Sequence, residues 1–306
     1  MTGTLATTVR EHGPSVPAPA SARGTPRAHS SVREALDGAI TAIAAGGCAT
    51  PRLDAELLLA GAFGCSRERL LLEPERAVPA GAVRAVREAV RRRAAEREPV
   101  AYILGRCHFR RLQLAIDRRA LVPRPETELL VEVGLTLPAG ASVLDVGTGS
   151  GAVALALKDE RPDLIVTGSD LSDPALELAR ANARRLGLEV GWLHADLLAG
   201  VPDCFDAVLA NLPYVAESER GALAPEIVRH EPPQALFAGA DGLDAIRMLL
   251  AGVSERRRVR LLALEVGAGQ APVVARLTRR AGFRAVAAEP DLAGIERVVL
   301  GRRRGR

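Results

Sequence analysis

The sequence predicts an α/β fold with a mostly parallel sheet, preceded by a small all-helical domain. Residues 31–98 place apolar side chains at helical spacing, whereas residues 125–302 alternate short apolar runs with helical stretches. With 306 residues, 48% of them hydrophobic, the chain can bury a large core, and more than one domain is expected.

The first hundred residues divide into a tail and a helical domain. Residues 1–30 are rich in Pro, Ala, Ser, Thr and Gly without apolar periodicity, which predicts a disordered tail. Ser31 and Glu34 have the spacing of a capping box at a helix start. Helices are then expected over residues 32–45, 54–63, 67–72 and 79–97, the last with valines inward and arginines outward. Nothing in this domain has a catalytic pattern.

A connector of residues 99–124 follows. Leu112, Leu114 and Ile116 alternate with other residues, and with the run before them they predict a β-hairpin. Next, two prolines make a stiff extended segment around Arg124. Two interpretations of Arg124 and Glu128 stay open, a surface ion pair or the wall of a pocket.

Strands and helices alternate in the remainder of the chain, which favours a parallel sheet. A helix is expected at 129–137, opened by Glu126 or Thr127, and Asp173 with Pro174 is expected to cap a later one. Strands are expected at 142–146, 164–169, 189–193, 206–210, 260–266, 283–288 and 294–300, and helices at 152–158, 174–186, 241–252 and 270–281.

Composition narrows the function classes. The formal net charge is +4, and the arginine runs at 91–93, 256–258 and 302–304 are typical of solvated helix faces and tails. Aromatic residues make up only 3%, which argues against stacking platforms for single-stranded nucleic acid. The cysteines lack C-x-x-C spacing and the histidines lack ligand pairing, so free thiols in a reducing cytosol and no structural metal are expected. Neither a membrane-spanning run nor a secretory signal is expected.

A glycine-rich turn after the first strand of the sheet indicates a ligand site. Its glycines let a ligand approach the backbone closely, and the turn comprises Gly147, Thr148, Gly149, Ser150 and Gly151. Asp145 lies just before it. Asp170 ends the second strand, where it can bind ribose hydroxyls, and Asp196 ends the third, near an adenine edge. No P-loop Lys-Ser/Thr follows the glycines, so triphosphate hydrolysis is not expected.

The tetrapeptide Asn211-Leu212-Pro213-Tyr214 ends the fourth strand. Asn211 offers a side-chain carbonyl and Leu212 a backbone carbonyl, and two such acceptors can hold one planar NH2 group. That arrangement suits a methyl acceptor whose lone pair is delocalised. Because no hydride-handling group is evident, the site favours S-adenosylmethionine over NAD.

An ordered set of motifs between residues 31 and 301 resembles the PrmC/HemK family of protein-glutamine methyltransferases. The segments that carry the resemblance are Glu98–Gly105, Pro123–Glu128, Leu144–Gly151, Asn211–Tyr214, Glu231–Leu236, Asp241–Leu243 and Asp291–Gly294. The resemblance implies a class I (Rossmann-like) methyltransferase sheet of seven strands over residues 125–302 and a substrate-docking role for residues 31–98.

The same resemblance implies a reaction. A methyl group would pass from S-adenosylmethionine to the glutamine of the Gly-Gly-Gln motif in class I peptide chain release factors. The glycine turn, Asp170 and Asn211 would bind the cofactor, with Asp196 and Leu197 beside the adenine. Asn211, Leu212, Pro213 and Tyr214 would hold the glutamine. A cytoplasmic monomer without membrane contact or direct nucleic-acid binding is expected.

Two departures from the family pattern bear on the acceptor. Leu212 stands where the family usually has a first proline, so the tetrapeptide is also similar to that of ribosomal RNA adenine dimethyltransferases. Leu212 precedes Pro213, which biases it to the extended conformation that a proline would have had. Leu197 stands where an aromatic residue often follows the adenine-side aspartate. The alternatives are a methyltransferase for a ribosomal-protein glutamine, a nucleic-acid adenine methyltransferase, and a cofactor-binding protein without catalysis.

Overall fold

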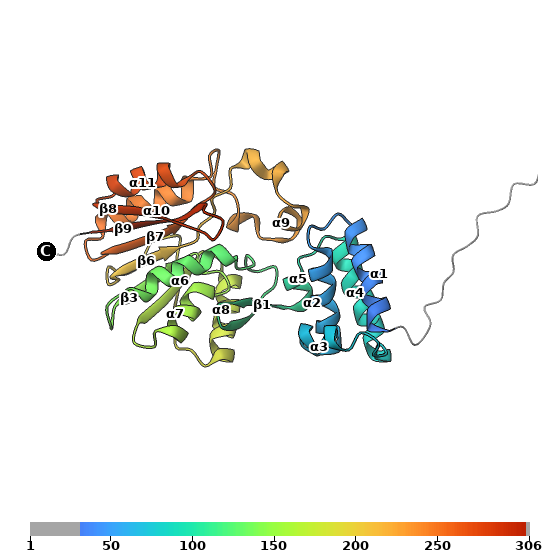
Figure 1. Ribbon diagram of the computed structural model, residues 1–306. Helices are drawn as coiled ribbons and strands as arrows, with labels where there is room; N and C mark the ends of the chain where they lie inside the picture. Colours follow the sequence, from blue (N-terminus) through green and yellow to red (C-terminus); the bar gives the residue numbers. More distant parts are fainter. Residues whose placement is uncertain (1–30, 304–306) are drawn as a thin grey trace, which may run out of the picture.

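A computed structural model describes residues 31–303. The expectation of a disordered tail at residues 1–30 therefore lies outside the described residues. Figure 1 shows two parts joined side by side, a helical part built from the first segments and a larger part built around a sheet. The predicted α/β fold class is confirmed, with the helical segment first in the chain.

The helical part packs around its own core. Its helices are α1 (Val32–Ala45), α2 (Pro51–Phe63), α3 (Arg67–Leu72), α4 (Ala80–Ala95) and the short α5 (Val100–Leu104). The predicted capping box is present, because the Ser31 hydroxyl accepts from the Glu34 N–H and the Glu34 carboxylate accepts from the Ser31 N–H. Leu36, Ile43 and Leu58 are buried in this core.

Two expectations for this region are wrong. The run at residues 100–104 forms α5 instead of a strand, between Pro99 and Gly105, whose φ of +67° ends the helix. Proline before a helix and a left-handed glycine after it are strong boundaries, and they outweigh an ambiguous apolar run. The hairpin is confined to β1 (Arg106–Phe109) and β2 (Leu112–Ala115). Arg93 of α4 points inward and is only 5% exposed, because acidic partners meet it there.

The larger part is a mixed sheet. Its strands run in the order β5-β4-β3-β6-β7-β9-β8, and all neighbours are parallel except those of β9. The strands are β3 (Ser142–Val146), β4 (Ile165–Asp170), β5 (Gly191–His194), β6 (Ala207–Ala210), β7 (Leu261–Glu265), β8 (Ala285–Pro290) and β9 (Glu296–Arg302). The parallel core places the carboxyl ends of β3, β4 and β6 at one edge.

Helices cover both faces of the sheet. One face packs against α6 (Glu128–Leu135), α7 (Ala152–Glu160) and α8 (Asp173–Leu186), and the other against α10 (Asp244–Glu255) and α11 (Ala271–Arg280). Side chains alternate accordingly: Val143 faces the first layer and Leu144 the second. The cap of α8 differs from expectation, since the Ser172 hydroxyl, and not Asp173, accepts the N–H of Ala175.

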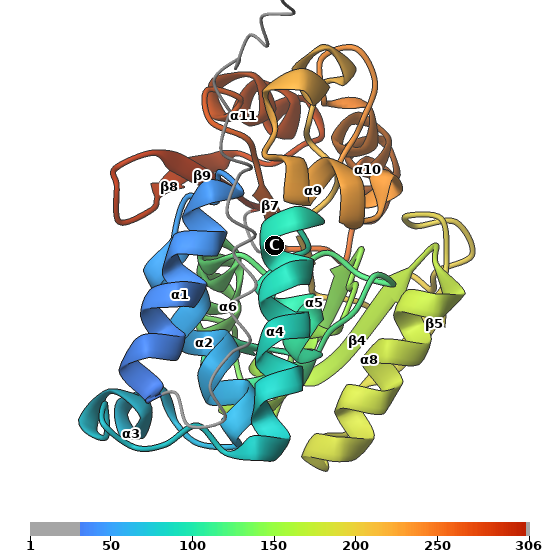
Figure 2. The same ribbon diagram turned by 90° about the vertical axis from the view of Figure 1, so that its right-hand side faces the viewer.

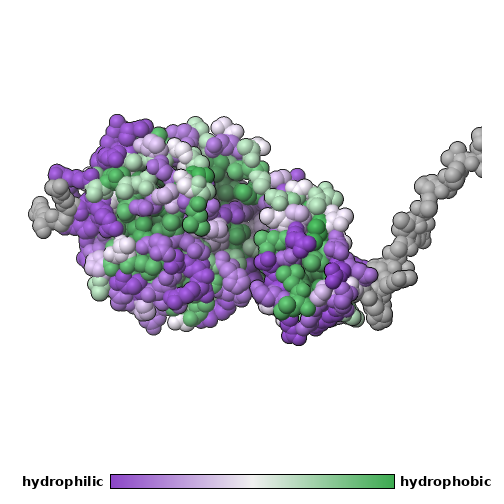
Figure 3. All heavy atoms as spheres, viewed as in Figure 1, coloured by the Kyte–Doolittle hydropathy of each residue, from purple (hydrophilic) through white to green (hydrophobic). Residues whose placement is uncertain are grey.

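Between β6 and β7 the chain makes an excursion that the sequence pattern did not predict. It contains α9 (Pro225–His230) and the short 3-10 turns η2 (Glu217–Ala222) and η3 (Pro233–Ala235), while η1 (Pro125–Thr127) precedes α6. Figure 2 shows α9 close to the top of α4 and α5. On the face shown in Figure 3 the molecule is hollowed between the two parts, and hydrophobic residues lie in that hollow. Across the described residues, no helix has the length and apolarity needed to cross a bilayer.

Candidate active site

The glycine-rich turn and the tetrapeptide lie against each other at the carboxyl edge of the sheet. Strands β3 and β6 are direct neighbours, with Val146 opposite Ala210. A Cβ on Gly147 would lie 3.2 Å from Leu212 Cδ2 and 3.4 Å from the Asn211 backbone oxygen. Gly147 also has a φ of +72°, which side chains rarely adopt. A glycine is therefore required for the two segments to approach this closely.

Backbone bonds hold the glycine turn to the neighbouring strand. The N–H groups of Gly147 and Thr148 both donate to the Ser169 carbonyl at 2.9 Å. Gly151, at a φ of +84°, is the residue from which α7 begins. A Cβ there would crowd the side chains of Leu155 and Trp192 at 3.0 Å. Gly151 thus shapes the turn from behind.

Asp145 forms a buried acidic floor beside the turn. Its side chain accepts from the Thr148 hydroxyl at 2.6 Å and from the Ala154 N–H at 3.2 Å. Burial raises the pKa of Asp145 to about 6, against the two hydrogen bonds that lower it. The residue therefore orders the turn from below through these two hydrogen bonds.

Asp170 reaches across from the end of β4. One carboxylate oxygen accepts from the Gly149 N–H and the other from the Ser172 N–H, both at 2.9 Å. Burial raises the pKa of Asp170, although these backbone hydrogen bonds oppose the shift. The carboxylate is thus held rigidly, with lone pairs left over for a ligand.

Beyond β5, Asp196 is exposed and Leu197 has a positive φ of 51°. That backbone conformation is uncommon for a leucine and sets the direction of the loop. Both residues face the same space as Asp170, because they line the cavity described next.

A cavity of about 620 Å³ joins these elements, within the usual range for small-molecule sites. All predicted site residues except Gly151 and Tyr214 line this cavity. Met248 and Phe237, which were not predicted, add apolar walls. The residues predicted for cofactor and acceptor that line it are Gly147, Thr148, Gly149, Ser150, Asp170, Asp196, Leu197, Asn211, Leu212 and Pro213.

The tetrapeptide is held from several sides. The Asn211 Nδ2 donates to the Thr127 hydroxyl oxygen at 3.0 Å, which leaves the Asn211 carbonyl for another partner. Gln270 Nε2 donates to the Tyr214 carbonyl at 2.9 Å. A Cβ on Gly242 would lie 2.1 Å from that same oxygen, so only glycine fits there. These contacts come from three distant segments.

Besides the apolar cavity walls, sequence reasoning missed two polar residues beside the tetrapeptide. Thr127 was considered only as a helix opener, yet it is buried against Asn211. Glu265 ends β7 at 2% exposure, near the Tyr214 hydroxyl. A carboxylate in an otherwise apolar strand was the signal available for Glu265.

Arg124 has a partner that the sequence did not predict. It pairs with the buried Glu231 at 2.7 Å, whereas Glu128 accepts from the Arg110 backbone N–H at 3.0 Å. Of the two interpretations left open for Arg124 and Glu128, the surface ion pair between them is therefore wrong, and neither residue lines the cavity. Burial raises the pKa of Glu231, and Arg124 opposes this shift. The pair ties the segment before η1 to the start of η3.

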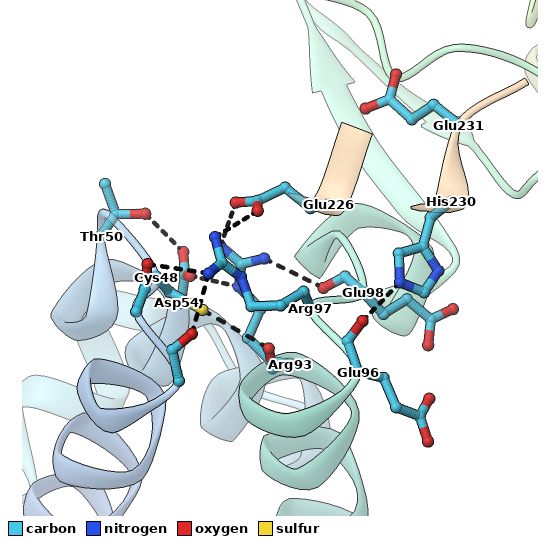
Figure 4. A network of polar contacts seen from close by, with 12 residues as sticks. Cys48, Thr50, Asp54, Arg93, Glu96, Arg97, Glu98, Glu226, His230 and Glu231 are labelled. Atoms are coloured by element: carbon cyan, nitrogen blue, oxygen red, sulfur yellow. Dashed lines mark hydrogen bonds and ion pairs between the residues drawn. The ribbon is translucent and has the colours of Figure 1, made fainter. Parts of the chain in front are cut away.

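A polar network joins α9 to the helical part (Figure 4). Arg93 pairs with Asp54 at 2.6 Å and with Glu226 of α9 at 3.2 Å. Arg97 binds the other oxygen of Glu226 at 2.5 Å. His230 Nε2 lies 2.7 Å from a backbone carbonyl of the α4 C-terminus. Because Glu231 follows His230 directly, the network reaches the segments around the cavity.

Comparison with known proteins agrees with this geometry. Residues 34–105 match the PrmC N-terminal domain family, and residues 125–241 match the methyltransferase small domain family. Among solved structures, the hMettl16 catalytic domain in complex with a MAT2A 3′UTR hairpin has a similar fold. Its TM-score is 0.52 at 16% identity, over 72% of this chain and 81% of that one.

Curated relatives cover nearly the whole chain. A release factor glutamine methyltransferase of Rhodospirillum rubrum is 43% identical over 84% of this chain and 81% of its own length. One from Deinococcus radiodurans is 40% identical over 90% of this chain and 99% of its own length. About 40% identity over both the helical part and the sheet part shows common descent. The chain therefore belongs to the release factor glutamine methyltransferase family.

Proposed function

We propose that this protein transfers a methyl group from S-adenosylmethionine to a glutamine side-chain amide nitrogen. The acceptor is the glutamine of the Gly-Gly-Gln motif in class I peptide chain release factors. The observation that carries the proposal is one cavity lined by both the glycine turn and Asn211–Pro213. The family relationship supports the choice of acceptor.

The residues of the cavity fit S-adenosylmethionine. The cavity volume of about 620 Å³ suits a ligand of that size. The glycine turn leaves space for the ligand that larger residues at these positions would fill with their side chains. Gly147–Gly151 and Asp170 would hold the amino-acid and ribose parts, while Asp196 and Leu197 would flank the adenine. When bound, this cofactor supplies a methyl group activated by its positive sulfonium centre.

The acceptor residues act by orientation. The side-chain carbonyl of Asn211 and the backbone carbonyl of Leu212 accept the two N–H groups of the glutamine amide. This would hold its nitrogen toward the methyl group that the cofactor supplies. Tyr214, which does not line the cavity, would support the tetrapeptide from behind through its carbonyl, held by Gln270. In the proposed transfer the nitrogen would gain the methyl group, and the sulfur of the cofactor would keep the electron pair of the broken carbon–sulfur bond. The nitrogen is then cationic and acidic, so its proton leaves to water after transfer.

Residues 31–98 are proposed to dock the folded release factor. They present no chemistry of their own, and the bonds of Arg93 and Arg97 to Glu226 connect them to the segments around the cavity. The protein is proposed to act as a monomer in the cytoplasm, where its proposed substrate works, without direct nucleic-acid binding.

Mass spectrometry after incubation with isotopically labelled S-adenosylmethionine tests the function. The substrates offered are a class I release factor, ribosomal proteins and ribosomal RNA. Label is expected on the Gly-Gly-Gln glutamine, and a release factor with Gly-Gly-Ala in its place serves as the matched control. Label on adenine or on a ribosomal-protein glutamine, with none on the release factor, contradicts the proposal.

A further inference from the structure

The turn between β8 and β9, residues 291–295, carries an exposed apolar surface that the proposed reaction does not use. Among residues 31–303, Leu292 is the most exposed of the large hydrophobic side chains, and Ile295 is 38% exposed. Pro290 and Ala293 beside them are also exposed. Single apolar side chains are common on protein surfaces, but several together on one projecting turn are typical of a contact site.

Asp291 holds this β8–β9 turn in one conformation. Its Oδ1 accepts from the Ala293 N–H at 2.9 Å and the Ile295 N–H at 3.0 Å, and its Oδ2 accepts from Arg297 Nε at 3.0 Å. The Asp291 N–H donates to the Ile295 carbonyl at 2.8 Å, and Gly294 has a φ of +79°, which glycine adopts without strain. A surface that is rigid before it binds loses little conformational entropy on binding, which favours a role in recognition.

The β8–β9 turn lies at the edge of the sheet that carries the acceptor tetrapeptide. Strands β7 and β8 are both antiparallel to β9, so they run in the same direction and end at the same edge. Val266, which follows β7, donates its N–H to the Arg297 carbonyl at 2.8 Å. Its neighbour Gly267 lies against the Tyr214 ring, where an added Cβ would be 3.3 Å from Tyr214 Cδ2. The turn is thus joined through Arg297 to the segment behind the tetrapeptide.

The place of the turn indicates what covers it. Figures 1 and 2 show the connection between β8 and β9 projecting from the larger part on the side of the helical part. The proposed acceptor glutamine belongs to a loop of a folded protein, which is far larger than the cavity. When that glutamine reaches Asn211, the surface that borders its loop must meet the rim at this edge of the sheet. The occupant that fits the turn is therefore the release factor.

We propose that the β8–β9 turn is a contact surface for the release factor, with Leu292 as an apolar anchor beside the Gly-Gly-Gln loop. This inference rests on the proposed function and adds a recognition site to it. Burying Leu292 against the partner removes apolar surface from water. The contact is equally strong in the ground state and the transition state, so its loss raises KM and leaves kcat unchanged.

The test uses Leu292→Ser in the full-length protein, with kcat and KM measured for intact release factor. We expect KM to rise about tenfold, as for truncation of an interface anchor, with kcat and the Kd for S-adenosylmethionine within about twofold of wild type. Ile165→Ser is the matched control, because Ile165 is 63% exposed and begins β4 at the opposite edge of the sheet. An unchanged KM for Leu292→Ser overturns the inference, as does an equal rise for Ile165→Ser or a loss in kcat alone.

A pair of variants at Asp291 tests whether the rigid turn makes the contact. Because Oδ1 carries both backbone hydrogen bonds, Asp291→Asn keeps the turn and Asp291→Ala releases it. KM is expected to rise about threefold for alanine and to stay near the wild-type value for asparagine. In the Leu292→Ser background the alanine change is expected to raise KM no further. Additive effects, or equal KM values for the two Asp291 variants, overturn the inference.

The two proposals fail differently. A wild-type enzyme that leaves the release factor unmethylated overturns the proposed function, and the inference with it. A wild-type enzyme that methylates it with the same KM as Leu292→Ser overturns only the role of the turn. Sedimentation of the free proteins tests a second copy of this chain as the occupant. A wild-type dimer that Leu292→Ser dissociates assigns the turn to self-association and overturns the inference.

Discussion

Replacing Asn211 by alanine removes the proposed acceptor for the glutamine amide while leaving the loop backbone in place. The Leu212 carbonyl remains, and Gln270 still holds the Tyr214 carbonyl. Losing one orienting contact lets the substrate nitrogen swing out of line. A misplacement of that kind costs about a hundredfold in rate, which corresponds to about 2.7 kcal/mol of transition-state stabilisation.

The effect on stability is expected to be much smaller. In the free protein, Asn211 forms one neutral hydrogen bond, from Nδ2 to Thr127 at 3.0 Å. Such a bond contributes about 1 kcal/mol, against a total stability of about 5–15 kcal/mol for a folded domain. A loss of that size lowers the melting temperature by about 2–4 °C. The unfolded fraction at 25 °C stays far too small to explain a hundredfold loss of rate.

Single-turnover methylation of release factor, measured beside melting temperature and cofactor affinity, separates the two effects. Asn211→Asp is the companion variant, because it keeps an acceptor at the same position. Its rate is expected to fall between those of wild type and alanine. The added charge near Glu265 costs stability, since two carboxylates then share a poorly solvated region.

Three outcomes would refute this reasoning. A folded Asn211→Ala with the wild-type rate removes Asn211 from the mechanism. A rate loss that tracks the unfolded fraction makes its role structural. Equal losses in cofactor affinity and rate place Asn211 in cofactor binding alone.

Three further predictions follow from the structure. Asp170→Ala is expected to weaken S-adenosylmethionine binding by about 1.5–3 kcal/mol, and unchanged affinity by calorimetry contradicts that role. Gly242→Ala places a Cβ 2.1 Å from the Tyr214 carbonyl oxygen, at a φ of +73°. The melting temperature measured by calorimetry is therefore expected to fall, and an unchanged melting temperature argues against this contact. Burial raises the pKa of Glu226, but a backbone hydrogen bond, Arg97 and Arg93 outweigh it and the pKa is lowered overall. The stabilisation from Glu226 is therefore fully present above the unfolded pKa of about 4.3 and lost as pH falls through the folded pKa. The melting temperature of Glu226→Gln should lie below wild type at pH 6–8 and approach it below about pH 4, so a gap that does not change with pH counts against this prediction.

Local sequence was enough for features that depend on neighbouring residues. Ser31 and Glu34 are three positions apart, so the capping box could be predicted from the local sequence alone. The apolar runs of β3 and β6 predict buried strands, and parallel strands place their carboxyl ends together. The convergence of the glycine turn, Asp170 and Asn211 on one edge was therefore predictable. The roles assigned to these residues stay predictions.

Tertiary packing decided the contacts between residues that are far apart in sequence. Arg93 lies in an arginine run typical of solvent, and it is buried because Asp54 and Glu226 converge on it from 39 and 133 residues away. Arg124 pairs with Glu231 over a separation of 107 residues instead of with Glu128 nearby.

The contacts of Asn211 with Thr127 and of Tyr214 with Glu265 arise in the same way, because separate segments meet at the end of β7. Periodicity reports which face of an element is buried, since that depends on local spacing. It carries no information on which polar group meets which once the elements pack. That choice is made by the relative placement of segments, because a buried charge or donor is stable only where packing brings it a partner.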